Sequence, residues 1–172
     1  MGKDTVTRLW MKAKSTNITF YRKTFIELLL TTLDFIYPAN VSFECNGCGL
    51  CCGDTKEKTR HILILESEAT IISGHSCLPI EKFAQATEKA PYVYEMKKPI
   101  DGKCFFLKNN ECTIYPNRPL ICRFYPFELK FDTEKGHHIF SFTLECPTIG
   151  KGKTFSRVYF EGLFRLAQEK LP

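Results

Sequence analysis

The sequence predicts a small α+β domain with a cysteine-rich loop, a short antiparallel sheet and flanking helices. Apolar residues show helical spacing near both ends of the chain, strand-like runs fill its middle, and nine cysteines fall mostly into two groups. A length of 172 residues suits one domain with short extensions. We expect an N-terminal helical extension over residues 1–40, a cysteine-cluster domain over 41–148, and a C-terminal helix over 149–172 that packs on it.

The first half of the chain is predicted to be mainly helical. Apolar residues recur there at spacings of three and four, and prolines and glycines mark the ends of the segments. The expected elements are a helix over 19–37 ended by Pro38, a strand over 61–65, a helix over 66–73 ended by Gly74, and a helix from Pro79 that ends before Pro91.

From Tyr92 onward, β-branched and aromatic residues indicate short strands. Asn109 and Asn110 are typical of a hairpin turn, and residues 134–136 predict a second one. The expected elements are strands over 92–96, 104–107, 112–115, 127–131 and 138–144, a flexible glycine-containing joint over 149–153, and a helix over 154–170.

Composition argues against several classes of partner. The formal charge is +5, but 24 basic and 19 acidic residues are intermixed, so there is no strong nucleic-acid signal. The longest apolar stretch, residues 25–37, contains two carboxylates and is too short to cross a bilayer. We find no secretory signal and therefore expect the reducing cytoplasm, where clustered cysteines bind metal more often than they form disulfides.

Eight of the nine cysteines are candidate metal ligands. The early group occupies eight residues among glycines, and its Cys-x-x-Cys spacing lets one turn present two thiolates to one ion. The candidates are Cys45, Cys48, Cys51, Cys52, Cys104, Cys112, Cys122 and Cys146. Eight thiolates would serve either two centres with four ligands each, or one cluster with an additional metal site.

The spacing favours an iron–sulfur cluster over zinc. Cys45, Cys48 and Cys51 match three-quarters of a bacterial ferredoxin motif, and Cys146 is followed by Pro147 as the fourth ligand of such motifs often is. Adjacent side chains diverge, so we do not expect Cys51 and Cys52 to share one tetrahedral centre easily. The isolated Cys77 is expected to be a small buried hydrophobic residue. A reduced thiol-rich core and structural disulfides are the less favoured alternatives.

Two arginines flank Cys122 in the sequence. Arg118 and Arg123 lie close to Cys122 in sequence. Our hypothesis is that both donate hydrogen bonds to thiolate sulfur and so lower the pKa of the thiol. The alternative is that they form ion pairs at the surface.

Two sequence blocks resemble a known family. They run from Cys45 to Cys52 and from Cys104 to Pro126, and they are similar to the CxxCxxCC proteins, also called YkgJ-like, a zinc- or iron-chelating family. The resemblance covers residues 43 to 146 and implies an oxygen-sensitive iron–sulfur centre or zinc held by these cysteines. Some larger relatives, the flagellin lysine N-methylases, combine the cluster with methyl transfer. This chain lacks the glycine-rich strand–helix turn that binds a dinucleotide or a similar cofactor, so we do not extend the methyl-transfer activity to it.

The sequence therefore predicts a metal-stapled domain. The leading hypothesis is a metal-binding protein that holds an iron–sulfur cluster, of the 4Fe–4S type, and serves electron transfer, metal handling or assembly with an unidentified protein partner. One alternative is an iron–sulfur-dependent group-transfer enzyme, which requires a concave pocket beside the centre. The other is a zinc-stapled structural or interaction module, whose metal would be redox-silent.

Overall fold

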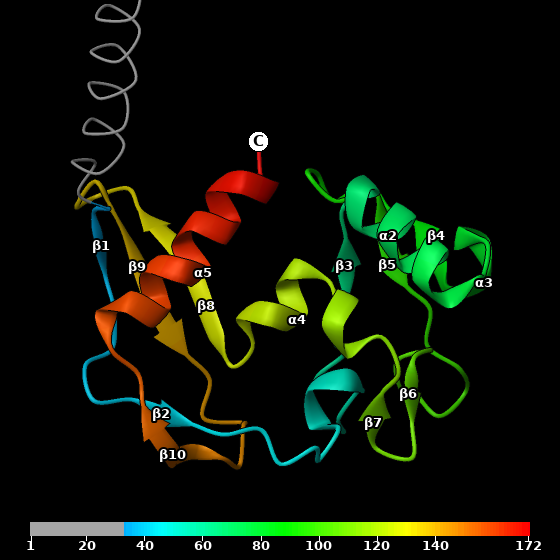
Figure 1. The fold of residues 1–172 in the computed structure, drawn as a ribbon, viewed down its shortest axis with the longest axis horizontal. Helices are drawn as coiled ribbons and strands as arrows, with labels where there is room; N and C mark the ends of the chain where they lie inside the picture. The colour runs from blue at the N-terminus through cyan, green and yellow to red at the C-terminus, as the bar shows by residue number, and fades with distance from the viewer. Residues whose placement is uncertain (1–32) are drawn as a thin grey trace, which may run out of the picture. The chain divides into compact units, whose positions relative to one another are not determined.

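The computed structural model describes residues 33–172 and combines helices with short, mostly antiparallel strands (Figure 1). The α+β class predicted from the sequence is confirmed. In chain order the elements are β1 (Phe35–Ile36), β2 (Ser42–Phe43), the 3-10 helix η1 (Leu50–Cys52), β3 (Leu63–Ile64), α2 (Glu66–Ser76), α3 (Ile80–Phe83), β4 (Ala84–Ala86), β5 (Tyr94–Met96), β6 (Leu107–Lys108), β7 (Glu111–Cys112), the 3-10 helix η2 (Tyr115–Asn117), α4 (Leu120–Phe124), β8 (Phe127–Asp132), β9 (His137–Phe142), β10 (Ile149–Thr154) and α5 (Arg157–Lys170).

One half of the fold is an aromatic cluster between a sheet and helix α5. The sheet has the order β1-β9-β8, with β8 and β9 joined as an antiparallel hairpin and β1 parallel to β9. Helix α5 places Phe160, which is fully buried, against Phe127 and Phe140, with both ring centroids 5.1 Å away. Burial of such large rings contributes much of the stability of this half.

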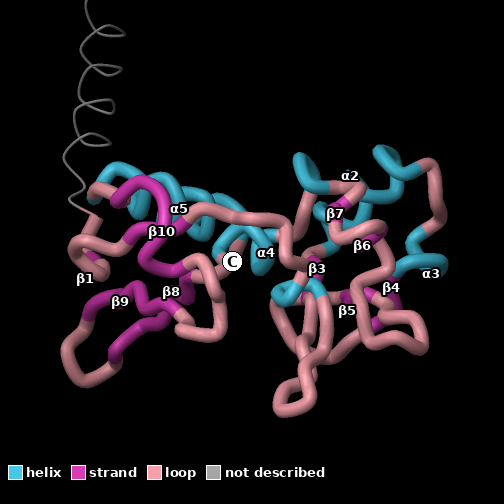
Figure 2. The backbone as a smooth tube through the Cα atoms, turned by 90° about the horizontal axis from the view of Figure 1, so that it is seen from below, coloured by secondary structure: helices cyan, strands magenta, loops and turns pink. Residues whose placement is uncertain are grey.

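The other half is built on the antiparallel sheet β3-β5-β4 and on helices α2 and α3. Its core includes Ile64, Ile72 and Phe83, all with no exposed surface, and extends to Cys104 and Phe106. Figure 2 shows the strands of the two halves as separate groups, with α4 between them. Residues 35–172 nevertheless form one compact unit.

A buried carboxylate ties α4 to the second half. Glu68, in the first turn of α2, is only 7% exposed. Its Oε2 accepts a hydrogen bond from the backbone N–H of Leu65 at 3.1 Å, and its Oε1 accepts one from Leu120 at 2.7 Å. One side chain thus satisfies backbone donors at the starts of two helices, which would otherwise be buried without partners.

Strand β10 connects the cysteine-rich loop to the C-terminal part of the chain. It pairs with β2 through Ile149 opposite Phe43 and Thr154 opposite Ser42, with a bulge between them. Gly152 has φ of 79°, and a Cβ there would approach that of Glu44 to 2.6 Å. The glycines of residues 149–153 therefore form a bulged strand rather than the flexible joint predicted from the sequence.

Several local predictions are confirmed, and others are wrong at their ends. The turns at Asn109–Asn110 and near Gly136 are present, with positive φ at all three residues. The predicted helix over 19–37 lies largely outside the described residues, and its end is wrong because residues 35–36 form β1. The proposed domain boundaries remain predictions.

Two helices differ from the predictions because other contacts outweigh local sequence signals. Helix α2 continues through Gly74 and ends at Ser76. The next residue, Cys77, caps the helix with a positive φ of 54° in the left-handed region. Helix α3 is only four residues long, because Ala84–Ala86 pair with β5 as an edge strand. Long-range strand pairing therefore outweighs the helical spacing of this segment.

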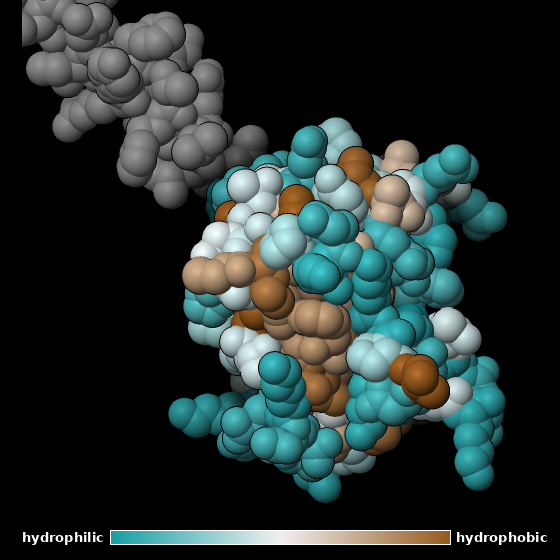
Figure 3. All heavy atoms as spheres, turned by 90° about the vertical axis from the view of Figure 1, so that its right-hand side faces the viewer, coloured by the Kyte–Doolittle hydropathy of each residue, from teal (hydrophilic) through white to brown (hydrophobic). Residues whose placement is uncertain are grey.

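The side of the molecule that carries α3 and β4 exposes hydrophobic atoms. Figure 3 shows a band of them between hydrophilic margins. A groove of about 540 Å³ runs beside β4 and is lined in part by Ile80, Ala84 and Tyr94. Within residues 33–172, no helix combines the length and apolar character needed to cross a membrane.

We predict that Glu68→Ala destabilises the protein by about 2–4 kcal/mol, because two buried backbone N–H groups lose their acceptor. Urea unfolding followed by circular dichroism measures this change. The matched control is Glu66→Ala, an exposed residue at the start of the same helix, for which we expect a loss of less than about 1 kcal/mol. Equal effects of the two substitutions would contradict the capping role of Glu68.

Candidate metal centre

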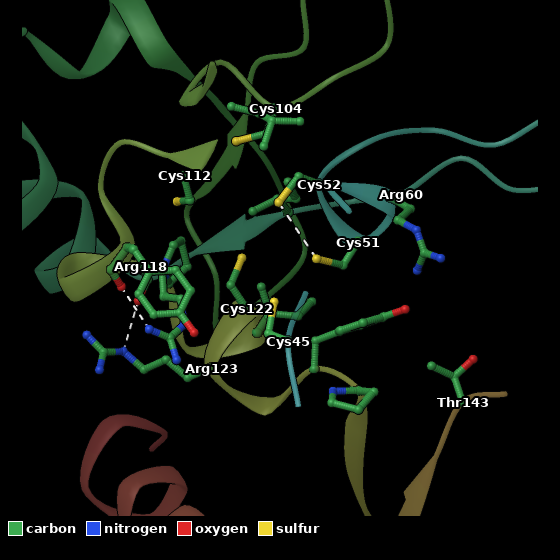
Figure 4. Close-up of a pocket in the computed structure, with 18 of the residues that line it drawn as sticks. Cys45, Cys51, Cys52, Arg60, Cys104, Cys112, Arg118, Cys122, Arg123 and Thr143 are labelled. Carbon is green, nitrogen blue, oxygen red and sulfur yellow. Dashed lines mark hydrogen bonds between the residues drawn. The ribbon is translucent and has the colours of Figure 1, made fainter. Parts of the chain in front are cut away.

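A cavity with a volume of about 1160 Å³ lies beside α4, η1 and the β6–β7 hairpin. Six thiols line it, and they come from three separate parts of the chain (Figure 4). They are Cys45, Cys51, Cys52, Cys104, Cys112 and Cys122. Six of the eight cysteines predicted as ligands are therefore brought together around one space.

The cysteine-rich loop is joined to Cys104 by backbone hydrogen bonds. The 3-10 helix η1 follows Gly49, whose φ of 72° permits the tight turn, and Cys52 N–H bonds to Gly49 C=O at 2.9 Å. Beyond it, Gly53 forms an antiparallel bridge with Lys103, and Cys104 N–H donates to Cys52 C=O at 2.6 Å. These contacts hold thiols 52 residues apart in sequence side by side.

The other two cysteines are positioned by a hairpin and a short helix. Cys112 lies on β7, opposite Leu107 of β6, after the Asn109–Asn110 turn. Cys122 lies on α4, which begins after Pro119 and is anchored by Glu68. Figure 4 shows the Cys112 and Cys122 side chains around the space that Cys45, Cys51 and Cys52 also line.

The thiols of Cys51 and Cys52 lie close together. Their Sγ atoms are 3.7 Å apart. Two thiolates bound at about 2.3 Å to one tetrahedral zinc ion lie ~3.8 Å apart, so this separation suits a shared metal atom. The divergence expected from adjacent side chains is wrong here, because the 3-10 turn directs both thiols into the cavity.

Ionisation differs among the thiols. The hydrogen bond from Cys52, with a smaller contribution from the positive charges of Arg60 and Arg118, outweighs burial and lowers the pKa of Cys51 to about 7. The same hydrogen bond, together with burial, raises the pKa of Cys52. Burial also raises the pKa of Cys112 and of Cys122, and it raises that of Cys104 to about 11. Among these five thiols, Cys51 is therefore the one that ionises most readily near neutral pH.

Three cysteines do not line the cavity. Cys48 is exposed on the loop, and Cys146 is buried with its Sγ 3.4 Å from Thr148 Oγ1. Cys77 caps the C-terminus of α2, and its side chain is exposed. The prediction that it is a buried hydrophobic residue is therefore wrong. Its position at a helix terminus leaves its side chain outside the core.

Both predicted arginines line the cavity, but their hydrogen bonds go to the backbone. Arg118 Nη1 donates to Tyr115 C=O at 2.8 Å, and its guanidinium lies 3.9 Å from the centroid of the Tyr115 ring. Arg123 Nε donates to Arg118 C=O at 2.9 Å, and its Nη2 donates to Pro116 C=O at 2.7 Å. Arg118 therefore influences the thiols through its charge, and Arg123 supports the segment that carries it.

Sequence reasoning missed Arg60, which lies near Cys51 on the opposite side of the cavity from Arg118 (Figure 4). Its Nη2 donates to Glu145 Oε2 at 2.6 Å, and its guanidinium faces the Tyr125 ring at 5.5 Å. Burial raises the pKa of Tyr125 to about 12. Arg60 lies in an unremarkable polar segment before β3, so no motif marks it.

The donor set defines the class of protein as a thiol-rich metal-chelating domain, since clustered cysteine thiolates select zinc, iron and iron–sulfur centres. Among residues 33–172, no three Cys, His, Asp or Glu side chains are already arranged as a complete metal site. The six thiols around the cavity are nevertheless chemically suited to such a metal.

The chain belongs to the CxxCxxCC family, whose profile matches residues 44–147 and whose description is "Putative zinc- or iron-chelating domain". It is also similar to an uncharacterized protein of Methanocaldococcus jannaschii, with 30% identity over 99 residues. The match covers 55% of this chain and 50% of the relative, so the chain spans about half of that protein's length. No solved structure matches the chain.

We predict that Cys52→Ala raises the pKa of Cys51 above 7, toward the value of 9.0 that it would have without its neighbours, because the main hydrogen-bond donor is lost. The pH dependence of iodoacetamide alkylation of the metal-free folded protein, located by mass spectrometry, measures this pKa. At pH 7, alkylation of Cys51 should become slower. In the control Cys77→Ala the profile should not move, and an unchanged profile in Cys52→Ala would contradict the assignment.

Proposed function

We propose that the chain binds iron or zinc through cysteine thiolates in the cavity between η1, α4 and the β6–β7 hairpin. The observation that supports this most directly is the convergence of Cys51, Cys52, Cys104, Cys112 and Cys122 on one space from three chain segments. Packing alone gives no reason for five thiols to meet beside arginine side chains. Cys45, on the same loop, is a sixth candidate ligand.

The thiol geometry favours a centre in which one metal atom carries both Cys51 and Cys52. Their 3.7 Å separation is close to the ~3.8 Å expected for two thiolates on one tetrahedral atom. A 4Fe–4S cluster distributes four cysteines over four irons, which requires larger separations. A single zinc or iron ion therefore fits this pair better, as does an iron atom of a 2Fe–2S cluster.

The second candidate is the 4Fe–4S cluster with a redox or accessory role. It is favoured by the Cys45, Cys48 and Cys51 spacing and by Pro147 after Cys146. With the ligand set suggested by these sequence motifs, Cys48, which is exposed, and Cys146, which is buried beside Thr148, would have to reach the centre. The two candidates thus assign different roles to the cysteines outside the cavity.

Metal analysis of protein purified without oxygen tests the proposal. We expect iron or zinc bound to the chain, with little acid-labile sulfide if the centre is a single ion. Sulfide in amounts similar to iron would establish a cluster. A chain that takes up neither metal under these conditions, even after reconstitution, would refute the proposed function.

Single cysteine variants separate the two ligand sets. We expect Cys122→Ala to reduce bound metal to less than about half, because it removes one donor from a tetrahedral set. Cys77→Ala, the matched control, should retain full occupancy. Cys146→Ala should also retain its metal if the ligands are those lining the cavity, and loss of metal in that variant would instead support the sequence-based ligand set.

A further inference from the structure

We propose that the cavity binds, beside the metal, a small molecule that carries an oxyanion, and that Arg60 and Tyr125 hold this group. The inference rests on the proposed function, because the candidate ligand thiols line the same cavity. The small molecule would bind beside the metal centre through a carboxylate or phosphate group.

The first observation is a guanidinium N–H without an acceptor. Arg60 Nε is buried and has no hydrogen-bond partner, although the side chain lines the cavity and is only 12% exposed. Its Nη2 is already engaged by Glu145. An unpaired buried donor of a charged group is costly, and an oxyanion is its natural acceptor.

The backbone of Arg60 is fixed, so its side chain is anchored for this role. Its N–H donates to Asp54 Oδ1 at 2.8 Å, and its C=O accepts a hydrogen bond from Lys98 Nζ at 2.7 Å. Lys98 in turn pairs with Asp54. Together with the Glu145 contact, these bonds restrict the guanidinium without using its Nε–H.

The second observation is a buried hydroxyl group that also has no hydrogen-bond partner. Tyr125 OH is buried, lines the cavity and has no hydrogen-bond partner. The Arg60 guanidinium lies 5.5 Å from the centre of its ring, so the two side chains that carry the unpaired donors are neighbours in the cavity lining. A neutral phenol hydroxyl and a guanidinium N–H together provide two donors for one anionic group.

Size and charge also favour such a ligand. A volume of about 1160 Å³ is slightly above the roughly 300–1,000 Å³ of typical small-molecule sites and far exceeds what one metal ion fills. The lining carries four permanent cations against two carboxylates; these residues are Lys58, Arg60, Arg118, Arg123, Glu111 and Glu128. Glu145, which pairs with Arg60 and Lys58, leaves that trio with one net positive charge.

The arginines predicted from the sequence are less suited to bind the anion. Arg118 and Arg123 direct N–H groups to backbone carbonyls at 2.7–2.9 Å. Arg60 is therefore the cavity arginine with a buried donor still unsatisfied. Its position near Cys51 places a bound oxyanion next to the proposed centre (Figure 4).

The test is isothermal titration calorimetry of the metal-loaded full chain with inorganic phosphate and, separately, with succinate at constant ionic strength. We expect at least one probe to bind with a millimolar or lower Kd. Arg60→Gln should weaken this binding at least about tenfold, and Tyr125→Phe several-fold. The charge-matched control is Lys82→Gln, an exposed residue on α3 outside the cavity, which should leave Kd unchanged. The probe that binds indicates whether the group is a phosphate or a carboxylate.

The proposal is overturned if neither probe binds, or if binding is the same in wild type and in both variants. If neither probe binds and both substitutions change the absorption spectrum of the cobalt-substituted protein, the two donors serve the metal-bound thiolates instead of an anion. Tyr125→Phe removes a hydroxyl without a hydrogen-bond partner and should fold normally, so it keeps the test decisive if Arg60→Gln is unstable. Metal content is measured for every sample: metal without anion binding refutes only this inference, whereas wild type without metal refutes the proposed function.

Discussion

The buried carboxylate of Glu68 is the constraint on which the arrangement of the site depends. It lies in the core half built on β3-β5-β4, yet it accepts a hydrogen bond from the first residue of α4. Because α4 carries Cys122 and lies between the two halves, this bond fixes one thiol relative to the helix that anchors it. The aromatic half packs on the other end of α4, where Phe124 stacks against Phe140. A single polar side chain is thus part of the connection between two hydrophobic clusters.

The thiols show why a metal is the appropriate occupant. Burial disfavours the thiolate form at Cys104, Cys112 and Cys122, while a hydrogen bond and nearby arginines favour it at Cys51. Several thiolates in one cavity would repel each other strongly without a compensating positive charge, and a divalent ion supplies that charge. The arginines that line the cavity supply a further part of this positive charge.

The sequence predicted the class of fold, the two hairpin turns and the family, because glycines, asparagines and cysteine spacing act locally. It also identified all six thiols that line the cavity. It did not predict that Ala84–Ala86 would be a strand, since that outcome depends on β5, which follows later in the chain. Arg60 and Glu68 were missed for a similar reason: their importance comes from Tyr125, Glu145 and Leu120, which are distant in sequence. The proximity of the Cys51 and Cys52 sulfurs depends on the 3-10 turn, which spacing alone does not reveal.

The pairing of β2 with β10 has a consequence for biosynthesis. The entrance to the cysteine-rich loop is held by residues 149–154, and Phe155 N–H donates to Val41 C=O just beyond this strand. On the ribosome, the loop of residues 45–52 emerges about one hundred residues before its strand partner. During that interval the loop lacks its pairing with β10, and the contacts of Gly53 and Cys52 with Lys103 and Cys104 are the first to become available. All six cysteines that line the cavity precede β10 in the chain, so the strand that closes the entrance to the loop is added after every cavity thiol has been synthesised.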